Sequence, residues 1–403
     1  MLAASFESEK MHRRRRRSTK KYLYFGIISI VIIVLIALRP WTYSLKWKNE
    51  SKYMRCIHSN EEKDNSEVFQ AYPEYNKDTK IILLWTHFFG SQTWFIPKLG
   101  RYILDRNNCS QRNCLFVTDR CYLDRSDALL FHAFQITQFQ RPAFRLPHQR
   151  WAVYALESPC YHDLSPIKGT PWNGDFNWTI SYRFNADITV YHGEIFKRPS
   201  PVHNDYDAIM KLKKKQVVWM VSNCQTESKR EKYVEELAKY IPVDIIGACG
   251  KLQCPHGEDC LKKIATEYKF HLSFENSLSE DYMTEKFFKT LPYPIVNVVR
   301  NGANMEAYQI PSDWYINTRD FESPKKLAEY LNALDKDDTK YIKYLKAKEQ
   351  FSSIDTQDEY CKLCEKLHDP KAPVKQQTDL YTWWNMDNSG KSKACKEPSD
   401  LNF

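Results

Sequence analysis

Short apolar runs separated by polar turns, arranged in two halves, constrain the fold of this chain most strongly. The first half has four such runs: KIILLW (80–85), CLFVT (114–118), ALLFHAF (128–134) and RWAVYAL (150–156). Runs that are apolar throughout are typical of strands buried on both faces of a parallel sheet. We therefore predict a Rossmann-like α/β domain over residues 79–200.

The second half repeats this pattern after a break. Residues 201–215 continue a stretch with prolines and a lysine cluster, which we interpret as a linker. Further strands are predicted at 216–221, 243–246, 268–274 and 295–299. A helix is predicted to begin at an S-x-x-E capping box formed by Ser228 and Glu231. The chain of 403 residues suits two domains.

These patterns define the second domain and the fold class. We place the second domain at residues 216–365 and a C-terminal tail at 366–403. Alternating strands and helices in both halves predict two doubly wound α/β domains that face a cleft.

The N-terminus predicts a membrane anchor. Residues 1–21 carry eight Lys or Arg and two Glu, and residues 22–38 are apolar without a charge. Seventeen apolar residues are at the short end of what crosses a bilayer, and the basic side is expected to face the cytoplasm. A cleaved signal peptide and a buried helix are the alternatives. No small-x-small cleavage pattern follows, and so uniformly apolar a stretch with asymmetric flanking charge is unusual in a soluble core. Residues 39–78 are interpreted as a stem.

The charge distribution excludes one class of partner. Of the formal net charge of +9, the first 21 residues account for +6, so the rest of the chain is nearly balanced. A nucleic-acid-binding protein concentrates basic residues on its folded part. We therefore expect no nucleic-acid partner.

The twelve cysteines suit an oxidising, lumenal compartment. For Cys249, Cys254 and Cys260, which with His256 resemble a zinc cluster, we favour disulfides. Cys361 and Cys364 could form a tight structural disulfide or a redox pair, and we favour the structural role.

Two further patterns concern glycosylation and metals. Asn49 and Asn108 are candidate glycosylation sites, although a bridged Cys109 would block the second. Asn177 is also in a sequon, but we expect it to be structural. Two D-x-D matches, at 205–207 and 335–337, do not follow an apolar strand, so no metal site is predicted there.

The stretch FENSLSEDYMTEKFF (274–288) concentrates polar chemistry where a strand passes into a helix. Lys286 and Arg230 lie near predicted helix starts, where cations are locally unfavourable unless an anion binds. A diphosphate would suit both side chains, and Glu285 could accept from ribose hydroxyls. Glu157 ends a predicted strand, where a general base could face the cleft. The alternative for all four is ordinary surface charge.

These motifs resemble a known family, the α-1,3-fucosyltransferases of glycosyltransferase family 10. The stretch 274–288 resembles its signature, with F-E-N-S, D-Y and T-E-K at the family's spacing. WMVSNCQTESKREKY, LESP, FNWTISYRFNADITVYHG and INTRDFESPKKLAEYL resemble further family motifs, in the family's order. CKLC resembles the family's paired C-terminal cysteines, and the cysteine-rich stretch 249–260 is most similar to arthropod members.

The resemblance implies a GT-B fold and an inverting transfer of L-fucose from GDP-β-L-fucose to O3 of N-acetylglucosamine in a glycan. It also implies a type II membrane enzyme of the Golgi with a lumenal catalytic domain. No cofactor is expected to be required, and a divalent cation such as Mn²⁺ is expected to be stimulatory at most. The acceptor, a core N-glycan or an outer Lewis-type or LacdiNAc residue, stays open.

The resemblance also implies site residues. Glu157 of ESP would be the catalytic base, and Arg230 and Lys286 would bind the pyrophosphate. Glu285 would hold the ribose and Tyr282 would line the donor pocket. The predicted donor-binding set also includes Asn276, from the F-E-N-S motif, and Ser222, from the S-N-x segment.

One stretch departs from the family pattern. Met305 stands where many members have a tyrosine, and Asn297 and Arg300 lie in the same altered stretch. This departure supports an alternative, a catalytically inactive Golgi pseudoenzyme that binds glycans or nucleotides, recognisable by donor binding without turnover.

Overall fold

The computed structural model describes residues 71–200, 202–254, 257–354 and 358–401. The predicted cytoplasmic tail (1–21), the anchor (22–38), residues 39–70 of the stem and Asn49 lie outside the described residues. Among the residues that are described, no helix is both long and apolar enough to cross a membrane. Residues Glu74–Phe403 form one compact unit, which holds both predicted domains.

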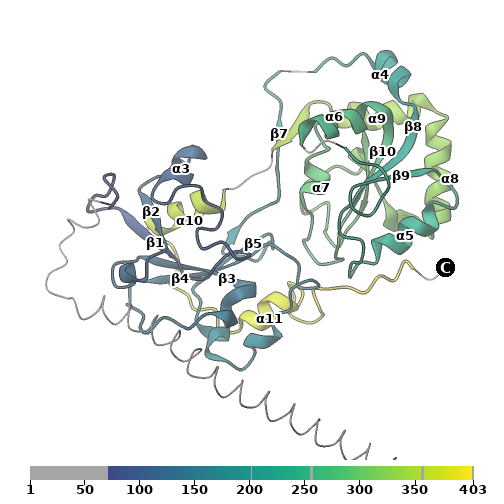
Figure 1. The fold of residues 1–403 in the computed structure, drawn as a ribbon. Helices are drawn as coiled ribbons and strands as arrows, with labels where there is room; N and C mark the ends of the chain where they lie inside the picture. The colour runs from purple at the N-terminus through teal and green to yellow at the C-terminus, as the bar shows by residue number, and fades with distance from the viewer. Residues whose placement is uncertain (1–70, 201, 255–256, 355–357, 402–403) are drawn as a thin grey trace, which may run out of the picture. The chain divides into compact units, whose positions relative to one another are not determined.

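A six-stranded parallel sheet forms the first domain, in the order β2-β1-β3-β4-β5-β6 (Figure 1). Its strands are β1 (Lys80–Leu84), β2 (Cys114–Val117), β3 (Ala128–His132), β4 (Arg150–Ala155), β5 (Trp178–Ser181) and β6 (Ile188–Thr189). Every residue of β2, β3 and β5 is buried, as expected for strands covered on both faces. The four predicted strands are confirmed, whereas β5 and β6 had no predicted counterpart.

A five-stranded parallel sheet forms the second domain, in the order β12-β11-β10-β8-β9 (Figure 1). Its strands are β8 (Lys215–Met220), β9 (Val243–Ile246), β10 (Tyr268–Phe274), β11 (Val296–Arg300) and β12 (Tyr315–Asn317). Its helices are α4 (Tyr206–Leu212), α5 (Arg230–Leu237), α6 (Glu258–Glu267), α7 (Glu285–Phe288), α8 (Pro324–Asp335) and α9 (Asp338–Lys348). The central strand β10 is buried at all seven residues.

In each sheet, the side on which the chain adds its next strand changes once. The chain adds β2 on one side of β1 and then β3 on the other, and it treats β8, β9 and β10 in the same way. In open parallel sheets such a reversal opens a crevice at the carboxyl ends of the two strands, and ligands bind there. The fold therefore marks two candidate ligand positions: beyond β1 and β3, and beyond β8 and β10.

The predicted linker differs from what the structure shows. Residues 201–215 contain α4, which Asp205 caps through its side chain, and Lys215 already belongs to β8. The two domains are instead joined through a two-stranded antiparallel ribbon of β7 (Glu194–Lys197) and β13 (Phe351–Ile354). The capping aspartate also explains Asp205 of the first D-x-D match without a metal.

The second predicted boundary, at residue 365, is wrong. Helix α10 (Glu359–His368) packs on the first sheet, where Tyr360, Leu363 and Cys364 are buried in the first core. The Tyr360 ring meets the Phe116 ring of β2 edge-on, with centroids 5.2 Å apart. The chain thus returns to its first domain after β13, before the predicted end of the second domain.

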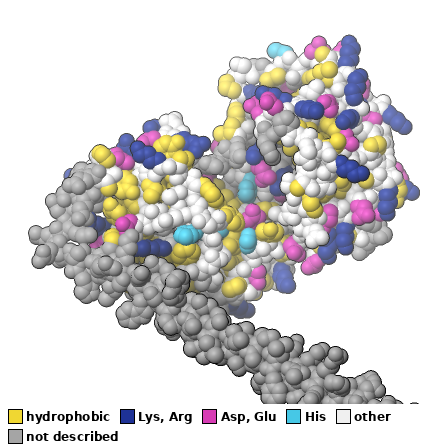
Figure 2. Space-filling model, in the orientation of Figure 1, with side chains coloured by type: hydrophobic (Ala, Val, Ile, Leu, Met, Phe, Trp, Pro, Cys, Tyr) yellow, Lys and Arg dark blue, Asp and Glu magenta, His cyan; other side chains and the backbone are white. Residues whose placement is uncertain are grey.

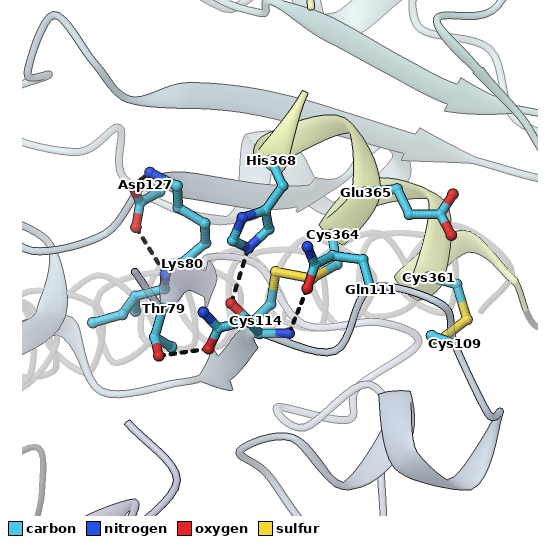
Figure 3. The surroundings of a disulfide bond; sticks show 12 residues. Thr79, Lys80, Cys109, Gln111, Cys114, Asp127, Cys361, Cys364, Glu365 and His368 are labelled. Carbon is cyan, nitrogen blue, oxygen red and sulfur yellow. Dashed lines mark hydrogen bonds and ion pairs between the residues drawn. A yellow bond between two sulfur atoms is a disulfide. The ribbon is translucent and has the colours of Figure 1, made fainter. Parts of the chain in front are cut away.

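Two disulfides fix this return. Cys361 is bonded to Cys109, and Cys364 to Cys114 of β2 (Figure 3). The predicted bridge between Cys361 and Cys364 is therefore wrong: both are in disulfides, but each has a partner about 250 residues away in the sequence. His368 lies beside the second bridge and contacts the Asn113 carbonyl at 3.0 Å (Figure 3).

Other described cysteines also form disulfides, as predicted for a chain in an oxidising compartment. Cys224 is bonded to Cys249, and Cys254 is bonded to Cys260. The three cysteines that resembled a zinc cluster, Cys249, Cys254 and Cys260, are therefore all in disulfides. A further bridge joins Cys160 to Cys395. Among the described residues, none of the cysteines is free. The one described group with metal-binding geometry contains Cys114 and Cys364, which are already bonded to each other.

The two described sequons differ in exposure. Asn177 is only 5% exposed, and its carboxamide bonds the backbone of Trp151 and Lys375, as expected for a structural residue. Asn108 is exposed, and its neighbour Cys109 is bridged, which is the condition expected to block glycosylation. Its glycosylation stays a prediction.

Candidate functional site

The polar stretch 274–288 lies at the crevice beyond β8 and β10. Strand β10 ends at Phe274, and the chain then turns through Glu275–Thr284 into the short helix α7. Strand β8 ends at Met220, and its following loop leads into α5, which begins at Arg230. The candidate site thus occupies the position that the strand order marks.

A carboxylate that follows β10 directly organises this turn. Glu275 is 1% exposed, and its Oε1 accepts from the Thr284 backbone N–H at 2.8 Å. The Thr284 hydroxyl also contacts both carboxylate oxygens, at 2.9 and 2.8 Å. These bonds close the loop on itself, because they join its first residue to its last.

Lys286 bridges two carboxylates at this point. Its Nζ lies 3.3 Å from Glu275 Oε2 and 3.1 Å from Glu285 Oε1, and it donates to the Thr284 hydroxyl at 2.8 Å. Its side chain is 23% exposed, so it can also reach a bound anion. The cation is thus held by one buried carboxylate, Glu275, and one that is 40% exposed, Glu285.

The charges of this cluster shift the acidity of its members. Burial opposes the ionisation of Glu285, but the neighbouring charges of Lys286 and His192 lower its pKa to about 2. Burial likewise opposes the charge on Lys286, yet Glu275 and Glu285 raise its pKa. Both side chains are therefore charged at neutral pH.

Arg230 lies beneath the same turn. It is 3% exposed, and its guanidinium donates to the carbonyls of Phe274 at 2.6 Å and Asn223 at 3.2 Å. Burial lowers the pKa of Arg230, whereas the nearby charges, Glu275 first, raise it. An arginine buried at this crevice contradicts the alternative of surface charge for this residue.

The predicted capping box is wrong. The helix cap is Lys229, whose φ is +50°, and the Ser228 hydroxyl instead donates to the Glu275 carbonyl at 2.7 Å. Glu231 accepts from the Thr226 hydroxyl at 3.0 Å. Ser228 thus ties the start of α5 to the end of β10, which places Arg230 under the turn.

Two other predicted donor residues are placed differently. Asn276 is half-buried, and its carbonyl accepts from the Ser228 N–H at 2.9 Å. Ser222 is exposed in the loop after β8, and a Cβ added at Gly247 would lie 3.1 Å from its hydroxyl. Ser222 is therefore at the edge of the crevice rather than in the charged cluster.

Several buried polar atoms here lack a partner. Among the described residues, these include Arg230 Nε, Asn276 Oδ1 and His192 Nε2. Buried polar groups are nearly always hydrogen-bonded, to protein, water or ligand. Water or a polar ligand in the crevice could supply these missing bonds.

Glu157 connects the first sheet to this cluster. It follows β4 by two residues, and its Oε2 accepts from the Tyr282 hydroxyl at 3.3 Å. Next to it, Ser158 and Ser277 share a hydroxyl bond of 2.6 Å. Tyr282 is 2% exposed, and burial, reinforced by the charge of Glu157, raises its pKa well above the usual value. The predicted base and the predicted donor turn thus meet through a neutral tyrosine.

Two site residues were missed by the sequence analysis. Glu275 could have been found, because it follows an apolar strand directly, as Glu157 nearly does. His192 comes after β6, and its ring lies 6.1 Å from that of Tyr282. No local pattern marks it, because only the tertiary fold brings it to the turn.

The altered stretch has structural partners. Asn297, in β11, accepts from the Thr290 hydroxyl at 2.7 Å and donates to the Phe287 carbonyl at 3.3 Å, so it fastens α7 to the sheet. Arg300 donates to the Ser228 carbonyl at 2.8 Å and to both carboxylate oxygens of Asp400. Met305 lines a cavity of about 1060 Å³ that also borders Asp281, next to Tyr282. The stretch therefore supports the site's framework.

Comparison with known families decides the identity. Residues 77–193 match the model for "Fucosyltransferase, N-terminal", and residues 210–383 match "Glycosyltransferase family 10 (fucosyltransferase) C-term". The chain belongs to the glycosyltransferase family 10 fucosyltransferases. The two matches cover both sheets and the return through α10, and they confirm the resemblance that the motifs indicated.

Two relatives of this fucosyltransferase come from Drosophila melanogaster, in agreement with the likeness to arthropod members. Alpha-(1,3)-fucosyltransferase C is 31% identical, over 78% of this chain and 79% of the relative. Glycoprotein 3-alpha-L-fucosyltransferase A is 35% identical, over 76% of this chain and 60% of the relative. A solved structure of an alpha1,3-fucosyltransferase with GDP-fucose is 15% identical with a TM-score of 0.44, covering 73% of this chain and 91% of that one. A likeness that low assigns no role to any residue here.

Proposed function

We propose that this fucosyltransferase is an inverting α-1,3-fucosyltransferase of the GT-B type. It would move L-fucose from GDP-β-L-fucose to O3 of an N-acetylglucosamine in a glycan. The observation that carries the proposal is the bond between Tyr282 and Glu157, because it joins the carboxylate that follows β4 of the first sheet to the cationic turn of the second. An acceptor base and a diphosphate site are the two parts that such a transfer needs.

The donor would bind beyond β8 and β10. Lys286 and Arg230 would face the diphosphate, which could supply partners for Arg230 Nε and other unpaired buried atoms. Glu285, ionised at all but very acid pH, would accept from the ribose hydroxyls. Asn276 and Tyr282 would line the pocket, with Ser222 at its edge.

The reaction follows from these positions. Glu157 removes the proton of the acceptor O3 as that oxygen attacks C1 of fucose from the face opposite GDP. The bond between C1 and the phosphate oxygen breaks, its electron pair passes to GDP, and the configuration at C1 inverts. The fucosyl group carries oxocarbenium character at the transition state. Lys286 and Arg230 stabilise the charge that develops on the diphosphate.

We also propose metal independence and a Golgi location. Two cations at the turn could stabilise the leaving group without a divalent ion, so Mn²⁺ would be stimulatory at most. A type II anchor over residues 22–38 would hold the catalytic unit in the Golgi lumen, where the disulfides suit the redox state. Activity in EDTA and staining of the tagged full-length chain test these two points; complete loss of transfer in EDTA would contradict the first.

Transfer by the full-length chain tests the main proposal. The chain is incubated in detergent with GDP-fucose and two acceptors, a trimmed N-glycan core peptide and an N-acetyllactosamine glycan, and the linkage of the product is mapped. Fucose at O3 of an N-acetylglucosamine supports the proposal, and its position identifies a core or an outer acceptor. Binding of GDP without transfer to either acceptor would favour the pseudoenzyme.

A further inference from the structure

The segment after α11 (Leu380–Asn385) runs between the two halves of the proposed site. The match to the C-terminal family model ends at residue 383, so residues 386–401 lie beyond it. Figure 1 shows this segment in yellow, leaving α11 beside the first domain and continuing to the second. Its contacts therefore need an explanation from the structure itself.

The covalent tie of this segment reaches the turn that carries the proposed base. Cys395 is bonded to Cys160, which comes three residues after Glu157. The turn is compact, because the Ser158 carbonyl accepts from the His162 N–H at 2.9 Å. The disulfide thus restrains the backbone close to the Glu157 carboxylate.

The same cysteine also pairs with the loop that carries the proposed donor residues. Residues 394–396 lie along the middle of the donor loop, which spans residues 275–284 and holds Tyr282. Cys395 is opposite Ser279 in an antiparallel bridge, and two backbone hydrogen bonds, of 2.8 and 3.0 Å, flank this pair. Cys395 therefore ties the donor loop to the turn of the proposed base.

Asn388 makes a second tie, which is not covalent. Its backbone N–H donates to Glu280 Oε2 at 2.6 Å, and its Nδ2 donates to Asp281 Oδ2 at 2.9 Å. Its Oδ1 accepts at 3.0 Å from Arg183, which is 1% exposed and follows β5 by two residues. Asn388 thus lies between a buried cation of the first domain and two acids of the donor loop.

Asp281 also contacts the first domain directly. Its Oδ2, which accepts from Asn388, accepts in addition from the Phe184 backbone N–H at 3.2 Å. Asp281 is 2% exposed, and Tyr282 follows it in the chain. These bonds therefore hold in place the tyrosine whose hydroxyl contacts Glu157.

We propose that Cys160, Cys395 and Asn388 are positioning residues for the transfer reaction. They form a strap that holds the turn of Glu157 against the donor loop, so that the base and the donor keep the separation that the reaction needs. The inference rests on the proposed function, because Glu157 and Tyr282 must belong to the reacting site. A misplacement of about 1 Å can slow a reaction ~100-fold, so a loosened strap should lower kcat.

Donor affinity should depend little on the strap. The strap contacts residues 278–281, whereas Lys286 and Glu275, 3.3 Å apart, hold each other at the two ends of the donor loop. A disulfide that only stabilises the fold changes the unfolding equilibrium and leaves the kcat of the folded enzyme unchanged. A loss of kcat without a loss of GDP affinity therefore distinguishes the strap from a purely stabilising bridge.

Two variants of the full-length chain in detergent test the strap. Cys160→Ser with Cys395→Ser removes the covalent tie without leaving a free thiol, and Asn388→Ala removes the carboxamide bonds while keeping the disulfide. Cys254→Ser with Cys260→Ser, which removes a bridge within the second domain, is the matched control. We expect kcat to fall about ten- to hundredfold in the first variant and about three- to tenfold in the second. Kd for GDP should stay within about twofold of the wild type in both, and the control should keep its kcat.

Hydrogen exchange gives a readout that does not need turnover. The amides of residues 278–281 should exchange faster in both strap variants than in the wild type, because their loop is less restrained. The amides of β10 should stay as slow as in the wild type. Unchanged exchange at 278–281 would overturn the strap whether or not transfer is observed.

The other outcomes separate the strap from the proposed function. An unchanged kcat in both variants would overturn the strap, and so would a fall in kcat that GDP affinity or the control variant shares. If the double cysteine variant does not fold, Asn388→Ala decides alone. Absence of transfer by the wild type to any acceptor would overturn the proposed function, and hydrogen exchange would then decide on the strap.

Discussion

Lys286 shows how single residues make this site work. Its Nζ lies within 3.3 Å of two carboxylates, which raise its pKa. These carboxylates neutralise the charge of Lys286 when no GDP-fucose is bound. The sequence marked Lys286 and Arg230 alike, as cations near predicted helix starts, and Glu285 as an acceptor for ribose hydroxyls, whereas Tyr282 was implied by the family resemblance. It could not predict that Arg230 is buried, because whether a guanidinium near a helix start points outward or beneath a turn depends on packing.

Removing the Lys286 charge should slow transfer. We expect Lys286→Met to lower kcat by at least ~100-fold, because a transition-state charge donor is lost. Steady-state kinetics with saturating acceptor measure this. The control is Lys289→Met, which changes an exposed lysine three residues further along the chain. It should keep near wild-type activity. A loss below tenfold would contradict the role of Lys286 at the leaving group.

Glu359 should make stability depend on pH. Burial raises the pKa of this carboxyl, at the start of α10, from 4.5 to about 7. The folded state therefore binds more protons than the unfolded state between these values, so this group lowers stability as pH rises through that window, by at most about 3 kcal/mol. Glu359→Gln should raise Tm at pH 8 more than at pH 5, whereas the exposed Glu365→Gln should not. Equal Tm changes at both pH values would contradict this.

The C-terminal segment is the element that the sequence analysis placed least well. After α10, helix α11 (Leu380–Asn385) meets the first domain through a bond of 2.8 Å from the Trp384 indole to the His162 carbonyl. The chain then reaches the second domain, where Asp400 pairs with Arg300. Eight strands of the two parallel sheets were predictable from buried apolar runs, to within one or two residues, whereas β5, β6 and β12 were not. The sheet on which a helix packs is set by contacts far away in the sequence, which no local pattern encodes.

The pair Asp400–Arg300 should affect the donor site. Arg300 also donates to the Ser228 carbonyl, so losing Asp400 would leave a buried guanidinium half-paired beside α5. We expect Asp400→Asn to raise KM for GDP-fucose by about three- to tenfold and to leave KM for the acceptor nearly unchanged. Glu329→Gln, which breaks the exposed pair with Lys326, is the control. An unchanged donor KM would contradict the link between this segment and the site.

At the scale of the whole molecule, the fold is a chain that leaves its first domain and returns to it. The ribbon of β7 and β13 carries the chain out and back, and the bridges Cys109–Cys361 and Cys114–Cys364 fasten the return. On the face drawn in Figure 2, basic and acidic side chains are interspersed over the described surface, in line with the nearly balanced charge outside the N-terminus. The cysteine count predicted disulfides, but pairings across about 250 residues needed the fold.

The long-range bridge should contribute more stability than a local one. The loop closed by Cys114–Cys364 has a sequence separation of 250, against 6 for Cys254–Cys260. We expect the double serine variant of the first pair to lose about 2–5 kcal/mol and that of the second pair clearly less. Denaturant unfolding, with proteolysis near residue 370, measures both. A larger loss in the second variant would contradict the fastening role of α10.

Glu157→Gln removes the carboxylate that we propose activates the acceptor, and it leaves the donor site of the second domain unchanged. Transfer from GDP-fucose and binding of GDP would be measured on the same full-length protein, with Glu194→Gln, an exposed acid of β7, as the control. We expect a loss of transfer of at least ~100-fold with GDP affinity within about threefold of the wild type. Transfer that stays near the wild-type rate in Glu157→Gln would contradict the proposed role of Glu157.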